Sequence, residues 1–184
     1  MNNKSILAGF LIGFAALLSC CIENNLISAL AFSIGLLYIR ISQSYLFTGQ
    51  IQNLKSHKTT AIKLLTGLIG NIAGVTLAFT IFFFLHFQNS ADKFFAITAI
   101  KWTYPWYHYL ASGFCCGILM TVATKKESPL WLSILCVMAF ILAGFNHCVA
   151  DWFYLLGSTD KIKYFYWFLV VIGNFFGGYS VATE

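Results

Sequence analysis

Four side chains near the C-terminal end of the chain could do chemistry, and all of them lie in an apolar run. Within LAGFNHCVADWFYLL (residues 142–156), Asn146, His147, Cys148 and Asp151 supply an amide, an imidazole, a thiol and a carboxylate. The spacing of His147 and Asp151 places both side chains on one face of a continuous helix. We therefore expect Asp151 to orient or hold the imidazole.

Three kinds of site fit these residues. His147, Cys148 and Asp151 could bind a metal ion, although no second histidine lies nearby. His147 and Asp151 could instead form a structural pair across a helix break. The third possibility is a group that lines a pore, because ionisable residues at membrane depth are costly and usually mark a pathway. Histidine can also change its charge near neutral pH.

The composition is that of a polytopic membrane protein. Hydrophobic residues make up 59% of the 184 residues and charged residues only 9%, whereas a soluble domain carries about 25% charged residues. The net charge of +5 comes from lysines and an arginine placed between apolar runs, so it is typical of charge that sets topology and not of nucleic-acid binding. The six cysteines lie in or beside apolar runs, and we expect no disulfides.

Six apolar runs have the length of a membrane span, which needs about 20 residues. They are Ser5–Ile22, Leu26–Ile41, Ile62–Phe87, Tyr104–Thr124, Leu130–Leu156 and Ile162–Ala182. One side of the membrane would carry Lys4, Arg40, Lys55, Lys58, Lys63, Lys125 and Lys126, and the other Lys93, Lys101, Lys161 and Lys163. The excess of basic residues on the first side predicts that both termini are cytoplasmic in a multi-pass protein of the plasma membrane.

Two of the runs are interrupted. Polar and aromatic residues alternate after Ile41, with a break expected near Gly49, and Gly144 and the polar cluster follow Phe140. Backbone that leaves a helix at membrane depth must be buried in protein or line a cavity. Both interruptions therefore predict a lumen.

The two halves of the chain resemble each other. GFLIG (residues 9–13) recurs as GFCCG (113–117), and GNIAG (70–74) recurs as GNFFG (173–177), at a nearly constant offset of about 105 residues. Each half holds three spans, roughly 5–87 and 104–182, so the halves would insert with opposite orientation. The sequence predicts one domain over residues 1–184, all-α, built as two inverted repeats with the functional site where their broken helices meet.

We expect the glycines and the remaining polar and aromatic residues to serve in helix packing or at the membrane interface. The repeated glycines have the spacing that lets helices approach closely. His57 is expected to be solvated, and His86 and His108 to lie near span ends. Trp102, Tyr104, Trp106 and Tyr107 are typical of an interfacial aromatic belt.

Several of these segments together resemble the formate/nitrite transporter family over nearly the whole chain. The matching pieces, in order, are AGFLIG, AFSIGLL, LFTG, GNIAG, MAFILAGFNHCVAD and GNFFGG. The resemblance implies an aquaporin-like protomer in a homopentamer, with Thr48 and His147 facing each other in the lumen of each pore. It also implies hydrophobic constrictions at Phe32, Leu36, Phe47, Met120 and Phe140, and a lysine, Lys101, that draws anions inward.

The lumen positions depart from the family pattern. Asn146 stands where the family has Glu, and Asp151 stands where it has Asn. Tyr45 replaces an acidic or small residue before LFTG. Gly117 stands for an Asn that we expect to donate a hydrogen bond into the lumen. These departures bear on the substrate more than on the fold.

We therefore predict a channel or transporter for small monovalent weak-acid anions, formate first and nitrite or hydrosulfide next. A bare anion crosses an apolar constriction at high cost, but a low-dielectric throat raises its proton affinity. Protonation, from His147 directly or through water, would give a neutral acid that passes; Asn146 and Asp151 would belong to the same pathway. The alternatives are a membrane interaction subunit that transports nothing and a membrane-embedded His/Asp enzyme. We expect no cofactor, no bound metal and no nucleic-acid partner.

Overall fold

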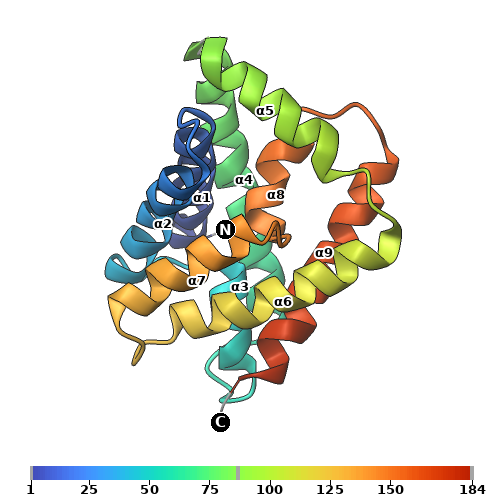
Figure 1. Cartoon of the computed structure of the whole chain (residues 1–184). Helices are drawn as coiled ribbons and strands as arrows, with labels where there is room; N and C mark the ends of the chain where they lie inside the picture. Colours follow the sequence, from blue (N-terminus) through green and yellow to red (C-terminus); the bar gives the residue numbers. More distant parts are fainter. Residues whose placement is uncertain (1, 86–87, 183–184) are drawn as a thin grey trace.

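The computed structural model describes residues 2–85 and 88–182, and the described chain is built of helices (Figure 1). They are α1 (Asn3–Cys20), α2 (Asn25–Ile41), α3 (Phe47–Gln50), the 3-10 helix η1 (Ile51–Leu54), α4 (Ala61–Leu85), α5 (Gln88–Lys101), α6 (Trp106–Thr124), α7 (Leu130–Leu142), α8 (Cys148–Leu155) and α9 (Ile162–Ser180). Each of the six apolar runs contains a helix, and the fifth run contains two, α7 and α8.

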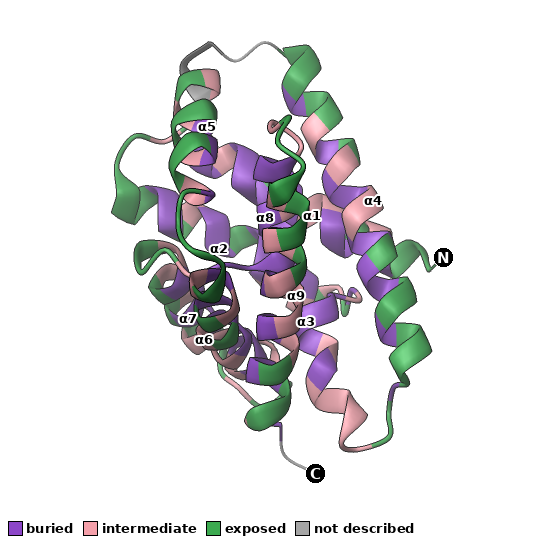
Figure 2. Ribbon diagram, turned by 90° about the vertical axis from the view of Figure 1, so that its right-hand side faces the viewer, coloured by how far each residue is buried: buried purple, intermediate pink, exposed green. Residues whose placement is uncertain are grey.

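Helix α5 was not predicted. Residues 88–101 carry charged and polar residues among the apolar ones, so the sequence shows no long apolar run there. The segment forms a helix at the end of the molecule opposite the C-terminus (Figures 1 and 2). It reaches across this end toward α8 and α1, and it contacts both.

The pairs α1–α4 and α6–α9 are the most closely packed helices. A Cβ atom on Gly74 of α4 would come within 2.0 Å of the Ile6 backbone oxygen, and a Cβ on Gly177 of α9 would come equally close to that of Phe114. Small residues therefore let the two backbones touch in each pair. Since α1 and α6 carry the GFxxG repeats and α4 and α9 the GNxxG repeats, the same sequence motif produces the same packing twice.

The outer surface of the bundle is apolar. Leu65, Ile69, Phe83 and Phe84 on α4 are at least half exposed, and Figure 2 shows the buried face of α4 turned toward the other helices. Helices α1 and α4 are long and apolar enough to cross a membrane. A large exposed apolar surface is unusual in a soluble monomer and is what lipid or another subunit would cover.

Helices α2 and α7 end in the same way. After α2, the Gln43 N–H bonds to the Arg40 oxygen and the Ser44 N–H to the Ile39 oxygen. After α7, the N–H groups of residues 144 and 145 repeat this pattern with the oxygens of residues 141 and 140. This is a Schellman motif, in which the residue after the helix adopts a left-handed conformation. Gln43 (φ 50°) and Gly144 (φ 73°) hold that position.

Each interruption is then fixed by an asparagine from a distant helix. Asn71 Oδ1 accepts the Phe47 N–H at the start of α3 (2.8 Å), and its Nδ2 donates to the backbone oxygens of Ser5 and Tyr45. The same three bonds recur in the second half. An Asn side chain supplies both an acceptor and two donors, so it can satisfy backbone groups that the broken helix leaves open.

Asn174 has the matching role in α9. Its Oδ1 accepts the Cys148 N–H at the start of α8 (2.8 Å), and its Nδ2 donates to the backbone oxygens of Gly113 and Asn146. Both asparagines are fully buried. The Asn of each GN motif is therefore a structural clamp on the interruption in its own half.

One expectation about the peripheral residues is wrong, and another concerns a residue outside the described part of the chain. Trp102 does not join an interfacial belt, because only 4% of it is exposed and its ring packs against Tyr109; Tyr104, Trp106 and Tyr107 are exposed as expected. His57 is exposed in the turn after η1. His86 lies outside the described residues.

Candidate functional site

Thr48 and His147 meet at the centre of the bundle. Thr48 is on α3 and His147 is the residue before α8, and the distance from Thr48 Oγ1 to His147 Nε2 is 3.0 Å. Neither side chain is more than 1% exposed. The interruptions of the two halves thus bring one hydroxyl and one imidazole together, as the family resemblance implies.

The second ring nitrogen of His147 defines which group donates. His147 caps α8, and its Nδ1 accepts the Ala150 N–H at 3.2 Å. A neutral imidazole with an accepting Nδ1 carries its proton on Nε2. Nε2–H therefore donates to Thr48 Oγ1, and the Thr48 hydroxyl keeps its own hydrogen for another acceptor.

Asp151 does not hold the imidazole, contrary to the prediction. His147 precedes the helix that contains Asp151, so the i, i+4 relation of a continuous helix does not apply to their side chains. The Asp151 carboxylate instead accepts from Asn146 Nδ2 (2.7 Å) and pairs with Lys101 Nζ (2.8 Å). Asn146 in turn accepts from Ser112 Oγ at 2.6 Å.

The Asp151 carboxylate offsets the field of the Lys101 ammonium, because the two groups form an ion pair. Lys101 is at the C-terminal end of α5, and the Asp151 side chain is 2% exposed. This is the one ion pair within 4.0 Å among residues 2–85 and 88–182. Lys101, which the resemblance implies draws anions inward, thus has a carboxylate as its partner.

Aromatic rings flank the Thr48–His147 pair. Phe32 of α2 and Phe140 of α7 meet edge to face with ring centroids 5.9 Å apart, and the Phe140 ring lies 5.7 Å from that of His147. The other predicted constriction residues, Leu36, Phe47 and Met120, are buried in the same apolar cluster. The polar pair is therefore enclosed by apolar side chains.

A cavity of about 400 Å³ lies on one side of Phe32 and Phe140. We call it the Lys93 cavity; its wall includes Lys93, Lys101, His108, Tyr104, Asn146 and Asp151. Two lysines thus face one carboxylate in this cavity. Helix α5 supplies both lysines, so the helix missed in the sequence forms a charged wall.

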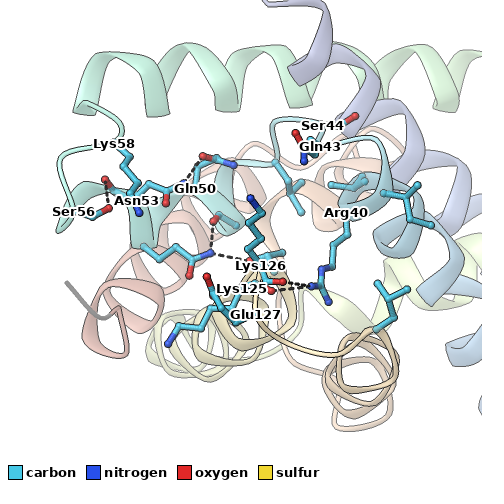
Figure 3. A pocket seen from close by; sticks show the side chains of 17 residues that line it. Arg40, Gln43, Ser44, Gln50, Asn53, Ser56, Lys58, Lys125, Lys126 and Glu127 are labelled. Atoms are coloured by element: carbon cyan, nitrogen blue, oxygen red, sulfur yellow. Dashed lines mark hydrogen bonds between the residues drawn. The ribbon is translucent and has the colours of Figure 1, made fainter.

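A larger cavity of about 920 Å³ opens beside α3. We call it the Arg40 cavity; its wall includes Arg40, Leu46, Gly49, Gln50, Lys58, Lys125, Lys126 and Glu127. Figure 3 shows Arg40 and Lys58 entering from opposite sides, with Lys125, Lys126 and Glu127 between them. The cavity reaches Leu46 and Gly49, which flank Phe47 and Thr48 in the sequence, while Phe140 in the wall of the Lys93 cavity lies against His147. The Thr48–His147 pair therefore lies between two basic cavities.

Comparison with known proteins identifies the family. The model of the formate/nitrite transporter family matches residues 1–183. The chain belongs to the formate/nitrite transporter family. It is thus a membrane protein of a family of channels and transporters, and not an enzyme.

Solved structures share the fold. A structure described as a pentameric formate channel with formate bound has a TM-score of 0.78 and 23% sequence identity, covering 95% of this chain and 90% of that one. An ion channel of the same family has a TM-score of 0.81 and 19% identity, covering 97% of this chain and 85% of that one. A comparison with curated proteins gives no match.

One departure from the family pattern has a different meaning from the one expected. Gly117 does not face a lumen, because a Cβ at this position would come within 2.3 Å of the Asn174 backbone oxygen. Gly117 is a contact between α6 and α9, so no lumen donor is lost there. Tyr45, in the interruption before α3, bonds to Thr59 through its hydroxyl.

Several residues that shape the site were not predicted from the sequence. Asn71 and Asn174 could have been found, since both lie in the GN motifs that repeat between the halves. Ser112, Arg40 and Lys93 gave no signal of their own. No group of three His, Cys, Asp or Glu residues that could hold a metal ion occurs in the described part of the chain, residues 2–85 and 88–182.

Proposed function

We propose that this member of the family conducts small monovalent weak-acid anions, formate first and nitrite or hydrosulfide next, through a pore in each protomer. The observation that carries the proposal is the Thr48–His147 hydrogen bond, buried between two basic cavities. One hydroxyl donor in an apolar throat can bind a single small acceptor. It offers no set of charges for a larger or multivalent ion.

The pathway runs from one cavity to the other. On one side Lys101, Asn146 and Asp151 line the Lys93 cavity, and Phe32 and Phe140 close its inner end. Thr48 and His147 follow, and then the Arg40 cavity. Leu36, Phe47 and Met120 complete the apolar constrictions around this pair.

Proton coupling follows from the cost of a bare charge in this throat. A monovalent anion loses its hydration between Phe32 and Phe140, and its proton affinity rises in the low dielectric. The Thr48 hydroxyl donates a hydrogen bond to it. Because Nδ1 of His147 is occupied by the Ala150 N–H, His147 holds Thr48 in place, and the proton that neutralises the anion arrives through water from a cavity.

The protomer is proposed to be two inverted repeats, residues 5–87 and 104–182, in one domain with helices broken at membrane depth. The matched roles of Asn71 and Asn174 support this arrangement. The exposed apolar surface and the pentameric assembly of the similar formate channel support a homopentamer. The distribution of basic residues supports a plasma-membrane protein with both termini in the cytoplasm.

The test is flux into proteoliposomes. Formate, nitrite and hydrosulfide are supplied separately at pH 5.5 and 7.5 to the wild type, Thr48→Val and His147→Ala. We expect saturable flux of at least one anion that depends on pH and falls at least tenfold in Thr48→Val, which keeps the shape of the side chain but loses the donor. Flux independent of pH would indicate a pore for neutral solutes, and no flux of any anion by folded protein would favour an interaction subunit.

A further inference from the structure

Arg40 holds one end of α6 at the wall of the Arg40 cavity. Its guanidinium donates to Ser133 Oγ and to the backbone oxygens of Lys125 (2.8 Å) and Ser128 (2.7 Å). Residues 125–128 directly follow α6 and lead into α7. Arg40 itself comes from the end of α2, in the other half of the chain, and its side chain is partly exposed to the cavity.

Lys93 holds one end of α1 at the wall of the Lys93 cavity. Its ammonium donates to the backbone oxygens of Ser19 (3.0 Å) and Ile22 and to Ser28 Oγ (3.4 Å). These oxygens lie at the end of α1 and at the start of α2. Lys93 comes from α5, and it too is partly exposed.

The two cations occupy corresponding places in the two halves. Ser28 Oγ donates back to the Ser19 oxygen at 3.0 Å, and Ser133 Oγ donates back to the Ala123 oxygen at 2.7 Å. Each serine lies at the start of the second helix of its half, and each also accepts a hydrogen bond from the cation. Thus the α1–α2 corner with Lys93 matches the α6–α7 corner with Arg40.

The cations themselves do not come from matching positions in the sequence. Arg40 belongs to α2, whereas Lys93 belongs to α5, which lies between the two repeats. A repeat of the sequence would place related residues at related sites. Here residues from unmatched positions supply a positive charge at the mouth of each cavity. The shared charge is therefore not a consequence of the sequence repeat.

Arg40 and Lys93 differ from Lys101 in having no carboxylate partner among the described residues. The partners of Arg40 and Lys93 are neutral oxygens, and in the described residues neither has a carboxylate within 4.0 Å. The end of a helix carries a partial charge of about −0.5, which offsets a part of theirs. Lys101, by contrast, lies 2.8 Å from the Asp151 carboxylate, whose full negative charge offsets its own.

We propose that Arg40 and Lys93 are charge-selective residues at the two mouths, and that each attracts small monovalent anions into its cavity. This inference rests on the proposed function. The hydrogen-bond donors of both cations are directed at the protein, so they act through their field and do not bind the anion tightly. A cleft with an uncompensated charge raises the local concentration of the opposite ion, and a weakly held ion can move on to Thr48.

The test removes the charge and keeps the hydrogen bonds. Glutamine at position 93 or 40 still donates to backbone oxygens but is neutral, so we compare Lys93→Gln and Arg40→Gln with Lys93→Arg and Arg40→Lys. The matched controls are Lys161→Gln and Lys63→Gln, which remove an exposed lysine that lines neither cavity. Formate flux is measured in right-side-out and inside-out membrane vesicles at about 0.05 M and 0.5 M salt.

We expect each glutamine variant to raise KM about three- to tenfold at low salt with Vmax within about twofold of the wild type. The two variants should act from opposite faces of the membrane, and the effect should shrink at high salt, where charges are screened over a few ångströms. The charge-retaining variants and the controls should keep the wild-type KM.

Two results would overturn the inference. An unchanged KM in both glutamine variants would mean that the cations do not attract the anion. A fall in Vmax at constant KM, insensitive to salt, would mean that they only secure the helix ends. If a glutamine variant does not fold, a threefold or larger rise in KM in its charge-retaining partner would equally count against a role of the charge. Failure of the proposed function is distinct from all of these, because then the wild type itself would carry no anion.

Discussion

The two interruptions, residues 42–46 and 143–147, share a scaffold and differ in chemistry. Both follow a Schellman motif, and both are fixed by a buried asparagine with the same three hydrogen bonds. The residue before the short helix is Leu46 in the first half and His147 in the second. The second residue of the short helix is Thr48 in the first and Val149 in the second.

This comparison separates what supports the site from what acts in it. The scaffold needs the same backbone groups satisfied on both sides, so it is repeated. The centre needs one imidazole and one hydroxyl that face each other, so each half supplies a different one of them. The imidazole of one half and the hydroxyl of the other form the 3.0 Å bond at the centre.

The largest effect is expected from the two asparagines. Asn71→Ala and Asn174→Ala each leave one buried N–H and two buried carbonyl oxygens without a partner, at a cost of about 1–3 kcal/mol for each group. Both variants should lose about 10 °C or more in Tm, measured by intrinsic fluorescence in detergent. The control is Asn53→Ala, since Asn53 is only partly buried. A large loss in one half and none in the other would contradict the shared scaffold.

The next largest loss of Tm is expected from Asp151, which lies on α8 directly after the second interruption. Asp151→Asn leaves Lys101 without its carboxylate at a site where the pair is mostly buried, which should cost about 2–4 kcal/mol. The loss would appear as a fall in Tm of the purified protein. The double variant Lys101→Met/Asp151→Asn removes the unpaired charge and should recover part of this Tm.

An additive result would go against the ion pair. If the Tm losses of Lys101→Met and Asp151→Asn simply add in the double variant, Lys101 and Asp151 do not interact. The first interruption has no ionisable side chain in residues 42–46 that could be compared in this way except Tyr45, which is bonded to Thr59.

Much of this architecture could be predicted from the sequence, and the failures have a common cause. Apolar length located the helices of the six runs, and the repeated GN motifs marked the resemblance of the two halves, although the role of their asparagines was not predicted. The resemblance placed Thr48 opposite His147, and these two side chains are hydrogen-bonded. Each of these features depends on apolar length or on a motif that is visible in the order of residues along the chain.

The failures concern contacts between segments. Helix α5 has no long apolar run, because its lysines Lys93 and Lys101 contact groups on other segments and interrupt the apolar pattern. The partner of Asp151 was misassigned because the spacing rule assumes a continuous helix. Arg40 and Lys93 gave no signal, because their partners are mostly backbone oxygens, which every residue has.

A smaller and more specific effect is expected from the size of the Thr48 side chain. Thr48→Ser keeps the hydroxyl and removes a methyl group, so the bond to His147 can persist while the throat widens slightly. Formate flux should stay within about threefold of the wild type, whereas Thr48→Val should lose tenfold, or about 1.4 kcal/mol. Equal fluxes in the two variants would show that the hydroxyl does not act. Val149→Thr, at the matching position of the second half, should not replace the hydroxyl in Thr48→Val.

The smallest effect is expected at the Schellman motifs, and it should have opposite signs in the two halves. Gln43 holds the left-handed position with φ 50°, at a cost of about 1–2 kcal/mol for a residue with a side chain, while Gly144 holds it with φ 73° and has free space around it. Gln43→Gly should therefore raise Tm by about 2–4 °C, and Gly144→Ala should lower it by a similar amount. Because a Cβ on Gly144 would meet no atom within 4 Å, any loss there reports the backbone conformation alone. If Gln43→Gly lowers Tm, the Gln43 side chain stabilises the first interruption by contacts that outweigh its strain, and the two motifs are equivalent in geometry but not in energy.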